Sequence, residues 1–221
     1  MINIPASKGV LKRQLIKYHH KLSHHNRVHI IAHHLVKKLD NLNLLPEHNR
    51  CVDIGSGDMK LVSIIDSIKP HWNWRCLDIH PARGEGGQWD RYEFFNGRNI
   101  PYGDKHFDIS LLADVLHHAE DIPALLQEAK RVSRYIVIKD HFEYGFYSNT
   151  MLKAMDIFGN WAYDVKVPGK YFTRKSFAEL CQRTGLEVVD MEIGMDLYQH
   201  LPVLNAILKS DWHFTAVLKS K

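Results

Sequence analysis

The chain has 221 residues, of which 45% are hydrophobic and 24% charged, and its formal net charge is +4. This size and composition are typical of one globular domain with one sizeable core, so residues 1–221 are treated as a single domain. No run approaches the about 18 consecutive apolar residues that a membrane span needs, and the amino terminus lacks the charged-then-apolar pattern of a secretory signal. We therefore expect a cytoplasmic protein with no membrane span.

The first forty residues are basic and rich in histidine. Apolar residues recur at helical spacing between about residues 25 and 40, which predicts an amphipathic helix there. His25, His29 and His33 lie four residues apart on this helix, but no carboxylate or cysteine completes a ligand set, so no metal is expected. The basic residues lack the interleaved aromatic rings of a nucleic-acid groove. They favour a solvated helix face, and we expect no nucleic-acid partner.

The stretch from Cys51 to Asp58 predicts a buried strand, then a glycine turn, then a helix. Gly55 and Gly57 let the backbone turn sharply and approach a ligand, and the first N–H groups of the helix point toward that ligand. Asp53 places a negative charge beside the turn, which would repel a pyrophosphate but attract an ammonium or a sulfonium. The stretch therefore predicts a site for a cationic nucleoside.

A second strand, Trp72 to Asp78, also ends in a carboxylate. In doubly wound sheets an acidic residue at this point accepts hydrogen bonds from ribose hydroxyls. The fingerprint of dinucleotide-binding proteins would require a glycine at position 60, where this chain has Lys60. The pattern thus favours a nucleoside over NAD.

Four motifs follow one another along the chain. They are Val52-Asp53-Ile54-Gly55-Ser56-Gly57, Leu77-Asp78, Ile100-Pro101-Tyr102-Gly103-Asp104-Lys105-His106-Phe107-Asp108 and Ala113-Asp114-Val115-Leu116-His117-His118. Together they resemble the motifs of class I S-adenosylmethionine-dependent methyltransferases over about residues 50–140. They are most similar to the small-molecule branch that includes the ubiquinone/menaquinone C-methyltransferases. One departure is Met59, which stands where those enzymes often carry a third glycine.

The resemblance implies a Rossmann-like α/β fold: a doubly wound, seven-stranded sheet, mostly parallel, with an antiparallel final strand. It also implies an amino-terminal helical lid (1–45) and a core (46–221) with a substrate-side insertion at about 142–172. The alternation of predicted strands and helices agrees, since it favours a parallel sheet with ligands beyond the carboxyl ends of the strands. Further strands are expected at 92–95, 107–112, 135–138, 189–193 and 212–218.

Capping residues predict the ends of two further helices. Asn149 or Thr150 can begin one, and Thr173 can begin another that stops at Gly185. The cysteines are odd in number and lie in apolar patterns, so we expect buried, reduced thiols at Cys51, Cys76 and Cys181.

The resemblance implies S-adenosyl-L-methionine as the cofactor. Asn96 stands where the family often has an aspartate that bonds the adenine amino group, and its carbonyl can accept the same hydrogen bond. The lid makes Arg27 and His25 candidate contacts to the methionyl carboxylate or the substrate. Cofactor contacts are expected from Asp53, Gly55, Ser56, Gly57, Asp78, Ile79, Asn96, Gly97, Ala113 and His118.

Candidate bases follow the fourth and fifth strands, where histidine is poised near the working pH. The expected catalytic residues are His118, Asp140 and His141. The segment after the fifth strand is rich in aromatic rings beside carboxylates, which could hold an aromatic or cationic acceptor or form a core lid. The expected substrate contacts are His117, Tyr144, Tyr147, Asn160 and Trp161.

Three functions agree with these residues. The first is methyl transfer from S-adenosylmethionine to a small molecule. The second uses another carbon of the same cofactor, for example in an intramolecular cyclisation, and the third is a non-catalytic partner subunit, against which the intact Asp53 and Asp78 argue. The sequence lacks the Asn/Asp-Pro-Pro-aromatic motif and the Pro-Cys nucleophile of nucleic-acid methyltransferases. It leaves open a protein substrate, the methylated atom and the oligomeric state.

Overall fold

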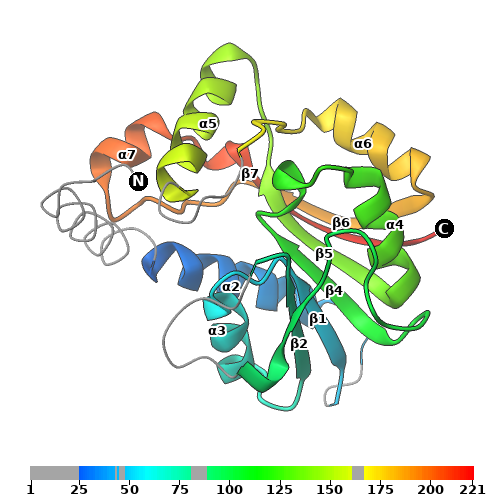
Figure 1. The fold of residues 1–221 in the computed structure, drawn as a ribbon. Coiled ribbons are helices and arrows are strands. Elements are labelled where there is room, and N and C mark those ends of the chain that lie inside the picture. The colour runs from blue at the N-terminus through cyan, green and yellow to red at the C-terminus, as the bar shows by residue number, and fades with distance from the viewer. Residues whose placement is uncertain (1–24, 43, 45–47, 81–88, 161–166) are drawn as a thin grey trace, which may run out of the picture.

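The computed structural model describes residues 25–42, 44, 48–80, 89–160 and 167–221. Its core is one seven-stranded sheet with the strand order β3-β2-β1-β4-β5-β7-β6. Strands β1 to β5 pair in parallel, and β7 is antiparallel to both β5 and β6 (Figure 1). The strands are β1 (Arg50–Ile54), β2 (Asn73–Asp78), β3 (Tyr92–Phe94), β4 (Phe107–Ala113), β5 (Ser133–His141), β6 (Leu186–Ile193) and β7 (His213–Ser220). The expected doubly wound sheet with an antiparallel final strand is confirmed.

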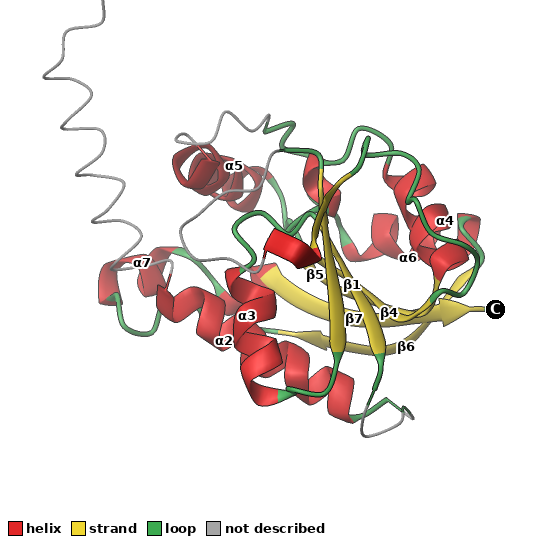
Figure 2. Ribbon diagram, turned by 60° about the horizontal axis from the view of Figure 1, so that its bottom comes forward, coloured by secondary structure: helices red, strands yellow, loops and turns green. Residues whose placement is uncertain are grey.

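Helices cover both faces of this sheet (Figure 2). Successive strand residues point to opposite faces, so in β1 Cys51 packs with α2 and α3 while Val52 and Ile54 pack with α4 and α6. Each face therefore has its own hydrophobic cluster. The helices are α2 (His25–Asp40), α3 (Lys60–Ile68), α4 (Ile122–Val132), α5 (Phe146–Asn160), α6 (Arg174–Arg183) and α7 (Pro202–Ile207), with short 3-10 helices at η2 (Trp89–Arg91), η3 (Leu116–His118) and η4 (Ser210–Trp212).

Local signals explain several helix ends. Helix α2 has the bounds that the sequence predicts. Asp121 caps α4 by accepting from the Ala124 N–H at 2.9 Å, and Thr173 and Ser176 form a reciprocal capping box at the start of α6. After α6, Gly185 takes a positive φ of 63°.

The predicted start of α5 is wrong by four or five residues, because a cap at Asn149 or Thr150 would place the first helical residue at 150 or 151. The helix begins at Phe146, after Gly145 with its φ of 112°, and neither Asn149 nor Thr150 caps it. Ser148 lies in the first turn, where its hydroxyl accepts from the Tyr144 N–H at 2.6 Å and donates to the Gly145 carbonyl at 2.9 Å. Of the three consecutive polar residues Ser148, Asn149 and Thr150, the first therefore stabilises the turn that leads into the helix.

Helix α5 belongs to the predicted insertion. A bridge between Phe142 and Phe172 closes the ends of this segment, and the Glu143 N–H donates to the Phe172 carbonyl at 2.7 Å. Because Phe142 directly follows β5, the segment leaves and re-enters the core at the carboxyl end of that strand.

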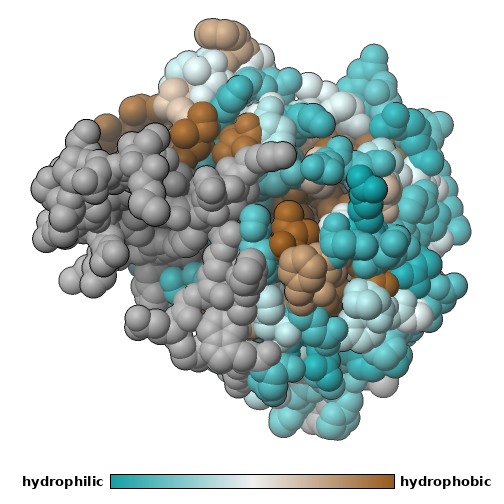
Figure 3. Space-filling model, in the orientation of Figure 1, coloured by the Kyte–Doolittle hydropathy of each residue, from teal (hydrophilic) through white to brown (hydrophobic). Residues whose placement is uncertain are grey.

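The three cysteines are buried free thiols, as expected. Among the described residues no helix combines the length and apolarity that crossing a membrane would require. On the face shown in Figure 3, hydrophilic residues predominate outside the undescribed part, and a small group of hydrophobic residues lies near the centre.

Candidate active site

The glycine turn after β1 is held close to two neighbouring strands. The Gly55 N–H donates to the Leu77 carbonyl of β2 at 2.7 Å, and Gly55 has a φ of 81°. A Cβ on Gly55 would lie 2.5 Å from Cγ2 of Val115, which follows β4. A side chain is therefore excluded at Gly55 by both backbone conformation and space. Gly57, also at positive φ, has no described atom within 4 Å of the position of a Cβ, so the backbone there stays open to a ligand.

Asp78 holds this turn from the end of β2. Its Oδ2 accepts from the Gly57 N–H at 2.8 Å and its Oδ1 accepts from the His80 N–H at 2.9 Å. A carboxylate oxygen has more than one lone pair, so both oxygens can still accept from hydroxyl groups of a ligand. The turn and the second acidic residue thus form one unit.

Asp53 lies beneath the same turn and is almost fully buried. Burial raises its pKa to about 7, the negative charge of Asp78 acts in the same direction, and Ser56 opposes the shift. The Ser56 hydroxyl itself donates to the Asp53 carbonyl at 2.8 Å. A buried carboxyl group with a raised pKa favours a cation as its partner, because a positive charge stabilises the ionised form.

Beyond β2 and β3 lies an open apolar surface. Ile79 is 52% exposed and Phe94 is 65% exposed, and a Cβ on Gly97 would lie 3.0 Å from Cγ2 of Ile79. Asn96 differs from the expectation in one respect. Its Oδ1 already accepts from the N–H groups of Arg98 and Asn99 at 2.9 and 2.8 Å, which leaves its NH2 group as a donor.

Met59 explains the missing third glycine. It stands at the N-terminal cap of α3 with a φ of 58°, a left-handed conformation that glycine adopts without strain. Its side chain is buried and packs with α2 and α3. The chain therefore has the glycine-type backbone at this position and uses the side chain to fill the core.

A second polar group occupies the carboxyl ends of β4 and β5. Asp114, which has a φ of 57°, accepts from Lys139 Nζ at 2.5 Å and from the Arg27 guanidinium of α2 at 3.1 Å. Burial alone would raise the pKa of Asp114, but the positive charges of Lys139 and Arg27 outweigh it and hold that pKa well below its usual range. This ion cluster ties the amino-terminal helix to the centre of the sheet.

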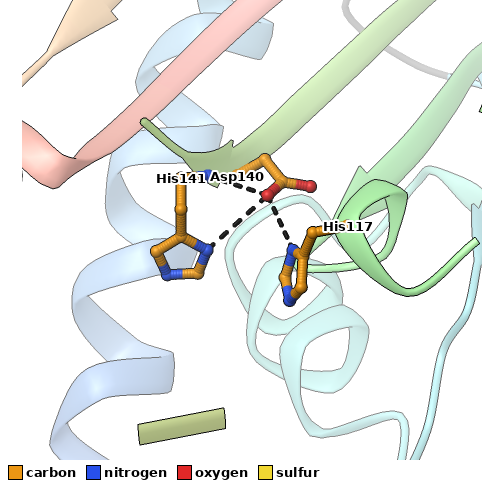
Figure 4. A group of neighbouring side chains, drawn as sticks. All are labelled: His117, Asp140 and His141. Carbon is orange, nitrogen blue, oxygen red and sulfur yellow. Dashed lines mark hydrogen bonds and ion pairs between the residues drawn. The ribbon is translucent and has the colours of Figure 1, made fainter. Parts of the chain in front are cut away.

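Asp140 links two histidines (Figure 4). Its Oδ1 lies 2.7 Å from His117 Nδ1 and accepts from the His141 backbone N–H at 2.8 Å. All three side chains are buried. Burial would lower the pKa of His117, but the carboxylates of Asp140 and Asp156 outweigh it and raise that pKa to about 10. For His141, burial and the charge of Lys139 prevail and lower the pKa, so its imidazole is neutral.

Helix α5 contributes to the same group through Asp156. Its Oδ2 lies 3.3 Å from His117 Nε2 and accepts from the Tyr171 hydroxyl at 2.5 Å. His213 on β7 packs edge-on against His141, with ring centroids 4.9 Å apart. Burial and the positive charge of Lys139 hold the pKa of His213 well below its usual range, which makes it a second neutral imidazole.

A small pocket adjoins this group. It lies between α2, α5, α7 and the carboxyl end of β5, so polar and apolar side chains share its wall. The lining residues are Arg27, His141, Leu152, Met155, Asp156, Tyr198, Leu208, Trp212 and His213.

The predicted site residues fall into three groups. Those at the glycine turn and those at or just beyond the ends of β4 and β5, including Ala113 and His118, lie at the carboxyl edge of the sheet. Tyr144 and Tyr147 are about half exposed, and their hydroxyls donate to the carbonyls of Asp211 and Ile207 at 3.1 and 3.4 Å, outside the pocket lining. Trp161 and the side chains of Asn160 and His25 lie outside the described residues.

Sequence reasoning missed several members of the polar group. Lys139 is fully buried although it is a lysine, and the signal was present, since it interrupts the apolar run of β5. Asp114 was part of a motif but received no role. No comparable signal marks Asp156, Tyr198 and His213, because each reaches the site through tertiary packing.

The architecture and the glycine turn beside two carboxylates are those of class I S-adenosylmethionine-dependent methyltransferases. Residues 22–191 match the sequence profile of a family described as a methyltransferase domain. The chain therefore belongs to this family, and it is an enzyme whose cofactor is S-adenosylmethionine. No curated protein sequence matches the chain.

Solved structures show the same fold at low identity. One is a chain in the complex between the Haloferax volcanii Trm112 methyltransferase activator and a provisionally described methyltransferase, with a TM-score of 0.66, 13% identity and coverage of 93% of this chain and 92% of that chain. An S-adenosylmethionine-dependent methyltransferase of Aquifex aeolicus has a TM-score of 0.59 and 15% identity over 93% of this chain and 96% of that one. Another from Thermotoga maritima has a TM-score of 0.59 and 17% identity over 97% of each chain.

Proposed function

We propose that the protein transfers the methyl group of S-adenosylmethionine to a small-molecule acceptor bound between α2, α5 and the carboxyl end of β5. The observation that carries this proposal is the pocket lined by Arg27, His141 and Asp156. It opens at the end of β5, two strands from the glycine turn after β1. Because neighbouring strands are about 4.8 Å apart, the two places are about 10 Å from each other, a distance that one extended nucleoside spans.

The cofactor contacts follow from the turn. Asp78 accepts from the ribose hydroxyls, and the ionised form of Asp53 attracts the cationic end of the cofactor. Ile79 offers an exposed apolar surface to the adenine. The NH2 group of Asn96 donates to an adenine ring nitrogen, since its carbonyl oxygen is already occupied.

The pocket favours an acceptor with an apolar body and a polar group. Leu152, Met155 and Trp212 supply apolar walls, while Arg27 and Asp156 supply charges of both signs. Pockets with a few convergent polar groups are typical of small-ligand sites, and this one, with a volume of about 20 Å³, has to widen to admit the acceptor.

The reaction needs positioning above all. The acceptor heteroatom attacks the methyl carbon as the bond from carbon to sulfur breaks, and the sulfonium leaves as the neutral thioether of S-adenosylhomocysteine. The proton of a hydroxyl or ammonium acceptor passes to a base. The neutral imidazoles of His141 and His213 line the pocket and are available as bases. In-line positioning can contribute about 7–11 kcal/mol to such a transfer.

Calorimetric titration with S-adenosylmethionine and S-adenosylhomocysteine tests the cofactor site. We expect saturable 1:1 binding of both compounds. Asp78→Ala should weaken this binding about 10- to 100-fold, which corresponds to the loss of one or two charge-assisted hydrogen bonds. Asp104→Asn is the matched control, since this carboxylate is 77% exposed and far along the chain from the turn. No binding of either compound by the wild-type protein would end the proposal.

Incubation of a metabolite extract with labelled cofactor then tests the acceptor. We expect a labelled small molecule together with S-adenosylhomocysteine. Methylthioadenosine released without any acceptor would instead show intramolecular cyclisation. Label on protein would replace the small-molecule acceptor with a protein substrate. If neither product forms, the assay is repeated with an added activator protein, because one similar structure is a complex of a methyltransferase with its activator.

A further inference from the structure

The imidazole of His117 is fixed in one orientation. Asp140 Oδ1 lies 2.7 Å from Nδ1, so that nitrogen carries a hydrogen and the ring cannot rotate freely. The other nitrogen, Nε2, is buried and has no hydrogen-bond partner. It lies 3.3 Å from Asp156 Oδ2, although the two atoms lack the alignment of a hydrogen bond. At neutral pH the raised pKa of His117 keeps a proton on Nε2, and a metal ion that binds there has to displace this proton.

We propose that His117 Nε2, one imidazole nitrogen of His118 and a carboxylate oxygen of Asp156 form a binding site for a divalent transition-metal ion. The donor atoms of these three residues lie within 4.8 Å of one another. The rings of His117 and His118 lie close together, with centroids 4.2 Å apart and planes tilted by 45°. Metal-binding histidines commonly donate from their second ring nitrogen to a carboxylate that orients the ring, and Asp140 is that carboxylate for His117.

The distances agree with coordination. Bonds of about 2.0–2.2 Å from a metal to nitrogen or oxygen place two ligand atoms roughly 3–4.4 Å apart on one ion. The pair formed by His117 Nε2 and Asp156 Oδ2, at 3.3 Å, already has this separation. The Tyr171 hydroxyl donates to Asp156 Oδ2 at 2.5 Å and keeps that carboxylate in place.

The ligand set indicates the kind of metal. Two imidazoles and one carboxylate suit Zn²⁺, Co²⁺ or Fe²⁺, whereas Mg²⁺ and Ca²⁺ prefer oxygen ligands alone. Three protein ligands leave coordination positions open, as in catalytic metal sites. Because Asp156 also lines the pocket, an acceptor oxygen could occupy an open position, and the ion would lower the pKa of that oxygen group. Only this catalytic role rests on the proposed function; metal binding does not.

A neighbouring combination, His117 with Asp140 and His141, is less suited to a metal. Asp140 Oδ1 already lies 2.7 Å from His117 Nδ1 and accepts from the His141 N–H at 2.8 Å. All three residues are buried, so an ion would have to break this arrangement to enter. His118 and Asp156 are only partly buried, which gives the proposed site an entrance.

The test measures metal binding without cofactor or acceptor. Chelator-treated protein is titrated with Zn²⁺ by calorimetry and with Co²⁺ by visible absorption. We expect one strongest site, weakened at least about tenfold by His118→Gln and by Asp156→Asn. The control is the double variant His29→Gln/His33→Gln, which removes a histidine pair of α2 with the spacing of a helical metal site and should leave the strongest site unchanged.

Two results would overturn the proposal: the absence of a strong site in the wild-type protein, or a strong site that His118→Gln and Asp156→Asn leave unchanged. Circular dichroism checks the folding of each variant, and the two partly buried positions make this test independent of the buried His117. Binding of S-adenosylmethionine is measured on the wild-type protein in parallel. A wild-type protein that binds S-adenosylmethionine but no metal would refute this inference alone.

Discussion

The imidazole of His117 and the carboxylate of Asp140 form a pair that is closed to solvent, with 2.7 Å between Nδ1 and Oδ1. His117 follows β4 and Asp140 lies near the end of β5, so the pair joins two adjacent strands. Removing one partner of a buried ion pair leaves the other charge uncompensated, which typically costs about 3–5 kcal/mol.

Asp140→Asn should therefore lower the free energy of unfolding at pH 7 by about 3–5 kcal/mol, measured by urea denaturation. Asp104→Asn removes a surface carboxylate that is 77% exposed and should cost less than about 1 kcal/mol. Equal effects of the two substitutions would show that the buried pair contributes no more than a surface one.

Gly55→Ala should destabilise the protein and weaken binding of S-adenosylmethionine. The new Cβ would meet Val115 Cγ2 at 2.5 Å, and the φ of 81° disfavours any side chain. Backbone strain of about 1–2 kcal/mol and overpacking of about 1–3 kcal/mol should add in thermal unfolding.

A double variant separates these two effects. Gly55→Ala/Val115→Ala should regain the part that comes from the clash and keep the part that comes from the backbone. Gly103→Ala is the matched control, because a Cβ there meets nothing within 4 Å and its φ lies outside the left-handed region. A control as unstable as Gly55→Ala would contradict the explanation.

The affinity for S-adenosylmethionine should rise as the pH increases through about 7. In the folded protein the pKa of Asp53 is raised to about 7 from an ordinary 3.8, with burial as the main cause. Below that pH the carboxyl group is protonated and cannot attract a cation, so affinity should fall up to about tenfold per pH unit. Asp53→Asn should bind S-adenosylmethionine more weakly at pH 8, and its affinity should not change with pH. Any pH dependence that remains in this variant would come from titration of the cofactor itself.

The same shift affects the stability of the ligand-free protein. A raised carboxyl pKa means that the folded state holds a proton that the unfolded state has lost between about pH 4 and 7, so stability falls over this range and stays low above it. Asp53→Asn should consequently be more stable than the wild type by about 3–4 kcal/mol at pH 8 and nearly equal to it at pH 4. Urea denaturation at the two pH values measures this, and a constant difference would contradict it.

Met59→Gly should be more stable than Met59→Ala by about 1 kcal/mol, the reverse of the usual order at the start of a helix. Both substitutions lose a buried side chain, at a cost of about 2–5 kcal/mol. Only glycine relieves the left-handed backbone at a φ of 58°. Chemical denaturation of both variants decides the order, and an alanine variant at least as stable as the glycine one would show that Met59 carries no strain.

Local patterns predicted the parts of the fold that depend on neighbours in the sequence. The strand and glycine turn at Cys51 to Asp58, helix α2 and the cap at Thr173 all follow from residues within a few positions of one another. Helix α7 was missed, because its six residues span too few turns for a period to show. The similarity to quinone C-methyltransferases in particular stays a prediction.

The site was predictable only to the point where side chains from distant segments meet. Asp53 and Asp78 could be expected to lie together, since carboxyl ends of parallel strands share an edge. The ion cluster of Arg27, Asp114 and Lys139 joins residues 25 and 87 positions apart. Contacts between residues so far apart in the sequence leave no periodic pattern. The lysine within the apolar run of β5 is the feature of the sequence that indicates this cluster.

Strand β7 has a consequence for synthesis of the chain. Its residues follow all the other strands in the sequence, yet it lies between β5 and β6 and pairs with both. While the nascent polypeptide is still on the ribosome, the edge of β5 from Tyr135 to His141 has no partner until residues 213–220 emerge. Unpaired edges of apolar strands favour aggregation, so this interval is the one in which a chaperone would be most useful to the newly made enzyme.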